Sequence, residues 1–238
     1  MIVLGIDLSG RSTGVTAAAV LEGRRYGRPR LTIWEDHALN GRRGDARLVD
    51  FAQRTRPGWI AIDAPLTLPH TVTCRDDHCR RCFPGGDVAP SYGSRALDGR
   101  AAWVARGYET KAPMPTAMIA ALAFRGIYLS RLFRRHGFKR VIETWPMGVY
   151  RALERAGDSR SARKTDDAWR RHQLQTVLDG VPGRRSAGKL SRDALDAVAA
   201  AYAAWCRAEG RADRIAASDA EDEGEIWIPR VPAGTRRS

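Results

Sequence analysis

The sequence lacks the short signatures that mark several large classes of protein. It contains no GxxxxGKS/T phosphate loop and no GxGxxG dinucleotide fingerprint, which argues against P-loop and Rossmann chemistry. No apolar run reaches the roughly 18 residues that a membrane-spanning helix needs, so we expect no such helix. The first residues already have a strand-like pattern and leave no room for a signal peptide, which predicts a cytoplasmic protein.

Lysine is also scarce, although the chain is strongly basic. Only 4 of the 40 basic residues are lysines, and the other 36 are arginines. A net charge of +13 and an isoelectric point near 10.4 indicate a polyanionic partner, nucleic acid in the first place. The arginine pairs are scattered along the chain rather than gathered in one tail, and a GC-rich genome produces the same bias. A solvated basic surface therefore remains the alternative.

The residues that are present predict a single α/β domain over 1–238. Hydrophobic residues make up 43% of the chain and charged residues 28%, which are globular values. The apolar patterns and turn residues predict strands over 1–8, 13–21, 31–37, 59–63, 139–144 and within 219–229, and helices over 44–53, 116–135, 147–156, 166–179 and 189–207. This order predicts a mixed sheet, with an antiparallel hairpin and parallel strands, flanked by helices. Residues 66–113, with many glycines and prolines, are expected to form a loop-rich insertion.

Two aspartates interrupt one of the best helix-forming stretches of the chain. Asp193 and Asp196 lie about 60° apart on a helix, so both side chains leave the same face, at the rim of an apolar stripe. Carboxylates are rarely buried there unless they are paired or bind a metal. A first helical turn capped by Ser191 explains Asp193 well and Asp196 poorly. The pair is therefore a candidate functional site.

Three further acids each end a predicted strand: Asp7, Asp63 and Glu143. Ligands gather at the carboxyl ends of strands in open α/β sheets, although single acids there are often turn residues. Together with the helix pair, these acids would form a cluster that cannot stay fully ionised without cations. Such hard oxygen ligands select Mg²⁺ or Mn²⁺, and two such ions about 4 Å apart would activate a water for attack on a phosphodiester.

Several short motifs occur in an order that resembles a known group of proteins. They are Gly5-Ile-Asp7-Leu-Ser9, Ile62-Asp63-Ala-Pro-Leu66, Glu143-Thr-Trp-Pro146, Asp193-Ala-Leu-Asp-Ala197 and Gly224-Glu-Ile-Trp-Ile-Pro229. In these motifs nearly the whole chain is similar to an uncharacterised family of predicted nucleases with an RNase H-like fold. The layout resembles the RuvC-like Holliday-junction resolvases more distantly.

The resemblance implies a divalent-metal-dependent nuclease that hydrolyses phosphodiester bonds of DNA or RNA with Mg²⁺ or Mn²⁺. Carried over position by position, Asp7 would bridge both metals and Asp63 would complete one metal site. Asp193 and Asp196 would complete the other. Glu143 has no counterpart in the resolvase pattern, and we expect it to contact a metal on the substrate side.

Two other functions stay open. In the first, the protein is a non-catalytic member of the same fold that binds nucleic acid or a nucleotide without cleaving it. The segment from Ser9 to Gly14 also resembles the phosphate-binding hairpin of actin-like ATP-dependent phosphotransferases, with Ser9 as the candidate cofactor contact. Those proteins hold ATP between two such domains, and 238 residues do not accommodate a second complete one.

The predicted insertion carries a group of potential metal ligands. His70, Cys74, His78, Cys79 and Cys82 fall within thirteen residues, and the last two have CxxC spacing. Cys74 or a histidine would complete a structural zinc site, which would explain how the insertion is ordered. No second CxxC is present, so free thiols and a redox pair remain alternatives.

The same insertion interleaves basic and aromatic residues, as surfaces that hold phosphates and stack bases do. The alternative is that it packs its few aromatic rings and solvates its arginines. The residues concerned are Arg75, Arg80, Arg81, Arg95, Arg100, Arg106, Lys111, Tyr92, Trp103 and Tyr108.

Overall fold

The computed structural model contains one seven-stranded sheet with the strand order β3-β2-β1-β4-β5-β7-β6. The strands are β1 (Ile2–Asp7), β2 (Thr16–Glu22), β3 (Arg30–Asp36), β4 (Trp59–Asp63), β5 (Val141–Glu143), β6 (Ala212–Ile215) and β7 (Ile226–Pro229). The structure describes residues 1–10, 14–25, 29–76, 78–80, 82, 94–105, 108, 113–154, 167–174, 190–216 and 223–230.

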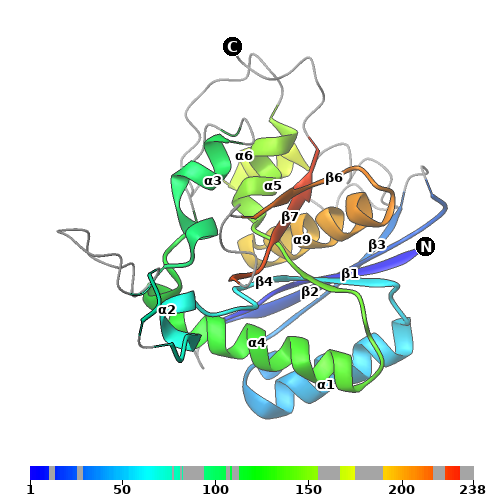
Figure 1. Cartoon of the computed structure of the whole chain (residues 1–238). Helices are drawn as coiled ribbons and strands as arrows, with labels where there is room; N and C mark the ends of the chain where they lie inside the picture. The colour runs from blue at the N-terminus through cyan, green and yellow to red at the C-terminus, as the bar shows by residue number, and fades with distance from the viewer. Residues whose placement is uncertain are drawn as a thin grey trace.

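The sheet mixes parallel and antiparallel strands. β1, β2 and β3 form an antiparallel meander, and β4 and β5 add to β1 as parallel strands. At the far side β7 pairs parallel with β5 and antiparallel with β6. This arrangement, with helices on both faces, confirms the predicted mixed α/β fold class (Figure 1).

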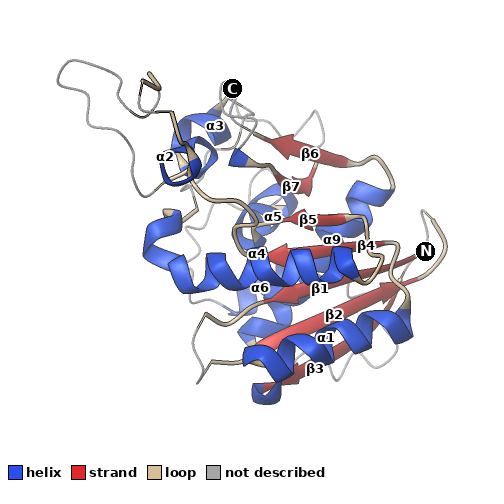
Figure 2. Ribbon diagram, turned by 60° about the horizontal axis from the view of Figure 1, so that its bottom comes forward, coloured by secondary structure: helices blue, strands red, loops and turns tan. Residues whose placement is uncertain are grey.

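Helices cover both faces of the sheet. α1 (Gly41–Thr55) and α4 (Ala120–Arg135) lie on one face, and α9 (Arg192–Ala208), α5 (Pro146–Leu153) and α6 (Asp167–Gln173) lie on the other (Figure 2). Short pieces complete the described chain: α2 (His70–Thr73), α3 (Arg100–Val104) and the 3-10 turns η1 (His37–Leu39), η2 (Ala96–Asp98) and η3 (Thr116–Ile119).

Each face of the sheet packs its own apolar core. Val3 and Ala61 pack with the alanines of α9, whereas Leu4 and Ile62 pack with α1 and α4. Side chains of a strand alternate between the two faces. Odd-numbered residues of β1 and β4 therefore point towards α9, and even-numbered residues point away from it.

The approach of α9 to the sheet depends on one glycine. A Cβ atom at Gly5 would lie 2.1 Å from the main-chain nitrogen of Ala201 and 2.3 Å from the carbonyl oxygen of Ala197. No other residue type fits between β1 and α9 without moving the helix. Gly5 thus sets the depth at which the helix carrying Asp193 and Asp196 docks.

Several expected boundaries differ from the observed ones. The strand β6 was not predicted, because its four residues Ala212–Ile215 alternate too briefly to stand out from a loop. Parts of the predicted elements lie outside the described residues: Thr13 of the second strand, residues 155–156, 166, 175–179 and 189 of the helices, and residues 219–222 before the last strand. The placement of all residues in one domain stays a prediction.

By length and composition, one helical stretch passes the criterion for a membrane span, contrary to our expectation. Residues Thr116–Arg135 have a mean hydropathy of 1.3, and one third of the apolar window (33%) is buried. Because a helix in the core of a soluble protein can meet the same criterion, a single such stretch is weak evidence for a membrane span. Leu129 and Phe133 of this stretch are fully buried against the sheet.

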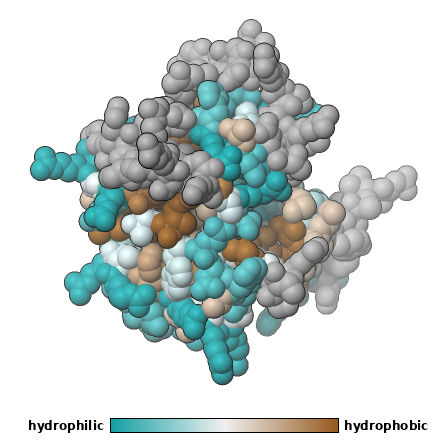
Figure 3. All heavy atoms as spheres, turned by 180° about the vertical axis from the view of Figure 1, so that it is seen from behind, coloured by the Kyte–Doolittle hydropathy of each residue, from teal (hydrophilic) through white to brown (hydrophobic). Residues whose placement is uncertain are grey.

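The surface seen from behind is largely hydrophilic. Apolar side chains reach it only in limited areas, several of which border segments drawn in grey (Figure 3). Most of the large apolar residues in the described part of the chain belong to the two cores instead.

Candidate functional site

Asp7 and Asp63 end the two central parallel strands and lie directly opposite each other in register. Neighbouring strands are about 4.8 Å apart, so the two carboxylates start from adjacent positions. Both residues are odd-numbered and point towards α9, as Gly5 and Ala61 do. Both are only partly buried, because they stand at the open edge of the core.

The first turns of α9 lie beside this edge. α9 begins after Ser191, whose hydroxyl accepts a hydrogen bond of 3.0 Å from a main-chain N–H of the first turn. Because α9 touches β1 at Gly5, its preceding turns lie near the end of that strand. Asp193 and Asp196 belong to these turns and stay partly exposed, whereas the helix is almost wholly buried from Ala197 on.

The four aspartates form one electrostatic cluster, as the sequence pattern predicted. The pKa of Asp7 is raised well above its usual value, first because folding removes the carboxylate from water and then because Asp63, Asp196 and Asp193 repel its charge. Burial also raises the pKa values of Asp193 and Asp196. Residues far apart in the chain therefore gather negative charge at one end of the sheet.

Two residues that sequence reasoning missed hold Asp196. The hydroxyl of Tyr150 in α5 donates a hydrogen bond of 2.8 Å to Oδ1 of Asp196, and Nε of Arg170 in α6 lies 3.2 Å from the same oxygen. Arg170 is buried with 5% exposure, and its charge opposes the raised pKa values of Asp7 and Asp196. No local pattern marks these contacts, because both helices reach the cluster only through tertiary packing.

Glu35 is a fifth acid on the same face of the sheet. Asp7 pairs with Ala17 on β2, and Ala17 pairs with Glu35 on β3, so the three residues form a row across the strands. Glu35 accepts a hydrogen bond from the Ser191 hydroxyl and contributes to the raised pKa of Asp193. The side chains of β3 alternate between the two faces of the sheet, so the strand register alone is enough to assign Glu35 to this face.

The structure separates Glu143 from the four aspartates, which corrects its expected role as a metal contact. Glu143 pairs in register with Ile62, whose side chain packs on the α1 and α4 face. Glu143 is not among the acids that raise the pKa of Asp7, and the charged groups that act on its own carboxylate are Arg95 and Asp98. Its carboxylate accepts a main-chain hydrogen bond of 2.8 Å from Leu66 and two from Arg95.

Arg95 is the centre of a buried ionic network, not part of a nucleic-acid surface. Its guanidinium donates to Glu143 at 2.6 and 2.7 Å and to Asp98 at 2.8 and 3.1 Å. Arg95 is only 2% exposed, and Trp103 and Tyr108 are also buried. Arg95, Trp103 and Tyr108 therefore do not belong to the expected basic and aromatic surface. The two rings are packed in the core, and Arg95 forms ion pairs with Glu143 and Asp98. Arg81, Tyr92, Arg106 and Lys111 lie outside the described residues.

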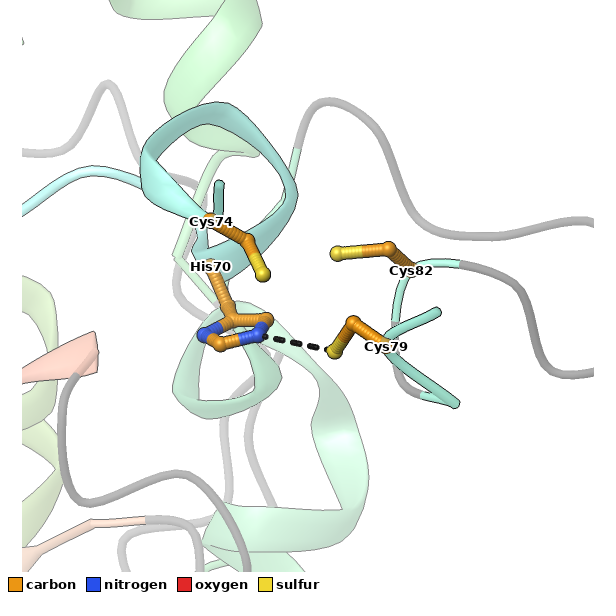
Figure 4. Close-up of side chains that lie close together, drawn as sticks. All are labelled: His70, Cys74, Cys79 and Cys82. Atoms are coloured by element: carbon orange, nitrogen blue, oxygen red, sulfur yellow. Dashed lines mark hydrogen bonds between the residues drawn. The ribbon is translucent and has the colours of Figure 1, made fainter. Parts of the chain in front are cut away.

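The predicted zinc ligands come together apart from one histidine. His70, Cys74, Cys79 and Cys82 have ligand atoms that all lie within 4.8 Å of one another, and their side chains point to a common centre (Figure 4). Burial and hydrogen bonds with Cys74 and Cys79 raise the pKa of the Cys82 thiol to about 12. His78 is exposed and does not belong to this set.

Ser9 lies in the segment after β1, beside the aspartate edge. Its main-chain N–H donates to the hydroxyl of Thr16 at 3.1 Å, and its carbonyl accepts a hydrogen bond of 2.7 Å from Arg125. These contacts order the turn but do not test a phosphate site. The role of Ser9 in binding a cofactor stays a prediction.

Comparisons with known proteins add a family and two structural neighbours. RuvC from Thermus thermophilus is 16% identical with a TM-score of 0.44, and the match covers 88% of this chain and 97% of RuvC. The resolvase of Fowlpox virus, solved in complex with substrate Holliday junction DNA, is 10% identical with a TM-score of 0.38 and the same coverages, 88% and 97%. No curated protein matches. The profile of the family described as "Protein of unknown function (DUF429)" matches residues 5–221, and the chain belongs to this family, as its motifs predicted.

Proposed function

We propose that this protein is a divalent-metal-dependent nuclease that hydrolyses phosphodiester bonds. The observation that carries the proposal is the meeting of Asp7, Asp63, Asp193 and Asp196 at one end of the sheet. This donor set fits Mg²⁺ or Mn²⁺, since it consists of hard carboxylate oxygens. The raised pKa of Asp7 supports the fit, because a cation would relieve the repulsion that causes it.

The environment of each aspartate indicates a distinct role. Asp7 interacts with the other three and would be the shared ligand, with Asp63 and Asp193 beside it. Asp196 is held by Tyr150 and Arg170, which orient it and limit its freedom to turn. When bound, the divalent ion supplies activation of water and stabilisation of charge on the phosphodiester.

A basic face formed by α1 and α4 supports nucleic acid as the partner. α4 contains no acidic residue, and the only exposed acid in α1 is Asp50. Phe124 and Tyr128 of α4 are 59% and 45% exposed, which is unusual for large rings and suits stacking on bases. The exposed arginines of this face are Arg42, Arg43, Arg47, Arg54, Arg131, Arg134 and Arg135.

The decisive experiment compares the wild-type protein with Asp7→Asn. Mn²⁺ binding is measured by calorimetric titration, and cleavage is measured on labelled single-stranded, duplex and branched DNA and RNA. We expect the substitution to weaken Mn²⁺ binding and to lower cleavage by at least about a hundredfold, the scale of a lost electrostatic contact to the reaction. Glu22→Gln, which removes an exposed acid at the end of β2 far from the cluster, should leave both unchanged.

Two outcomes would reject the proposal. A wild-type protein that binds no Mn²⁺ and cuts none of these substrates would remove its basis, and so would Asp7→Asn with full activity. Retention of nucleic acid without cleavage would favour a non-catalytic binding protein instead. One observation favours this second function. The positive charge of Arg170 lies beside Asp196 and compensates part of the negative charge that would otherwise attract a metal ion. Turnover of ATP would point to a phosphotransferase.

A further inference from the structure

The strongest feature outside the aspartate cluster is the group of His70, Cys74, Cys79 and Cys82. His70 begins the one-turn helix α2, Cys74 follows that helix, and the other two cysteines belong to the CxxC segment after it. All four side chains converge in Figure 4, although α2 is the only regular element among the described residues from 70 to 82.

The spacing of the ligand atoms fits one tetrahedral metal ion. Zn–S bonds of about 2.3 Å and Zn–N bonds of about 2.0–2.1 Å place the ligand atoms of such a site about 3.5–3.8 Å apart. Here Nε2 of His70 lies 3.3 Å from Sγ of Cys79, and no pair of the four ligand atoms exceeds 4.8 Å. A shift of a few tenths of an ångström to about one ångström completes the geometry.

The chemistry of the ligands also favours zinc over the alternatives. Three sulfurs and one imidazole nitrogen form a Cys₃His set, which structural zinc sites use, whereas Mg²⁺ and Mn²⁺ prefer oxygen. None of the four cysteines forms a disulfide bond in the structure. Four protein ligands leave no open position for a substrate, so the site is structural rather than catalytic.

The group is tied to the rest of the fold through its main chain. The N–H of His70 donates a hydrogen bond of 2.7 Å to Glu223, whose carboxylate also accepts from the N–H of Ala96. Ala96 follows Arg95, which pairs with Glu143 at the end of β5. A metal at His70 would therefore fix the insertion next to the end of the sheet that carries the aspartates.

We propose that His70, Cys74, Cys79 and Cys82 bind one structural Zn²⁺ that fastens the insertion to the sheet. His78 is not a ligand. The proposal is independent of the nuclease proposal, because it uses no residue of the aspartate cluster.

The test is elemental analysis of the untagged, reduced protein purified from zinc-supplemented medium. We expect about one zinc per chain for the wild type, and less than about a tenth of an equivalent for Cys79→Ser after passage over a chelating resin. His78→Ala and Cys206→Ala are the matched controls, since they remove a nearby imidazole and a distant thiol, and both should keep the zinc.

A second measurement does not depend on the folding of any cysteine variant. Replacement of zinc by Co²⁺ in the wild type should give the visible bands of tetrahedral, thiolate-bound cobalt, and His78→Ala should leave the spectrum unchanged. Wild-type protein without stoichiometric zinc, iron in its place, or zinc that His78→Ala releases would each overturn the proposal. Zinc retained in Asp7→Asn shows that this site stands even if the nuclease proposal fails.

Discussion

At the scale of single residues, Asp63 and Glu143 show how one step along a strand changes a role. Both end a parallel strand at the same edge of the sheet, but Glu143 pairs with Ile62 rather than with Asp63. Asp63 lies in register with Asp7, whereas Arg95 binds the carboxylate of Glu143. The position of an acid at a strand end is readable from sequence, whereas the register that selects its neighbours is not.

The substitution Glu143→Gln should destabilise the fold without reaching the metal cluster. It leaves the buried charge of Arg95 compensated only by Asp98, and breaking one member of a buried ion pair costs about 3–5 kcal/mol. Urea denaturation should show this loss in the free energy of unfolding. Mn²⁺ binding to the folded variant should equal that of the wild type.

Glu154→Gln is the matched control for this prediction. Glu154 pairs with Arg151 in a partly exposed ion pair, and such pairs contribute about 0–1 kcal/mol. Equal stability losses in the two variants would contradict the central position that we give to the Arg95 network. Loss of Mn²⁺ binding in folded Glu143→Gln would return Glu143 to the metal site.

At the scale of elements, the contact between β1 and α9 positions the candidate site. The run of alanines and the acid pair predict α9 as a helix with one polar rim, and this prediction is confirmed. The sequence did not indicate that the helix would cross β1 at Gly5, because that contact joins residues nearly two hundred positions apart. The cluster exists only because this docking is close.

Gly5→Ala should therefore lower stability and disturb the cluster together. The added methyl group would meet main-chain atoms of Ala197 and Ala201, which cannot turn away as a side chain can. Overpacking in a tight core costs about 1–3 kcal/mol, and here we expect about 3 kcal/mol or more. Thermal unfolding and Mn²⁺ titration of the same sample measure the two effects.

Gly58→Ala provides the comparison, since a Cβ at Gly58 would have only the carbonyl oxygen of Ile2 nearby, at 3.7 Å. This variant should unfold and bind Mn²⁺ much as the wild type does. If Gly5→Ala behaved in the same way, the close approach of α9 to β1 would be wrong.

At the scale of the whole molecule, positive charge is unevenly paired with negative charge. Arg211, Arg214 and Arg230, near the β6 and β7 edge, each form an ion pair with a carboxylate. The exposed arginines of α4 lie on a helix without any acid. Of these two regions, the face of α1 and α4 therefore offers more unpaired positive charge to a polyanion.

The triple substitution of Arg131, Arg134 and Arg135 by Gln should weaken nucleic-acid binding at low salt. If each arginine neutralises one phosphate, the slope of log affinity against log salt should fall by about 2–3 for duplex DNA. Fluorescence anisotropy over a salt series measures this slope. The same triple change at Arg211, Arg214 and Arg230 matches the loss of charge, and it should alter the slope much less. Equal slopes in the two triple variants would remove the basis for a binding face on α4.

The zinc ligands and the aspartates differ in how far sequence could predict them. The five candidate ligands for zinc fall within thirteen residues, so their proximity was expected, and the fold only had to select His70 over His78. The four aspartates are spread over most of the chain. Their common edge followed from strand and helix positions, but the contacts of Asp196 with Tyr150 and Arg170 did not.

By itself, the sequence determined most of the segments that form strands and helices, β6 excepted, and the side chains that end them, because periodicity and turn chemistry act over a few residues. It thereby also determined the mixed α/β class and the acids available for a metal. Only the tertiary structure decided that Glu35 lies in register with Ala17 and Asp7, and that Glu143 binds Arg95 instead of joining the four aspartates. Strand register and helix docking depend on contacts between distant residues, which no local pattern records.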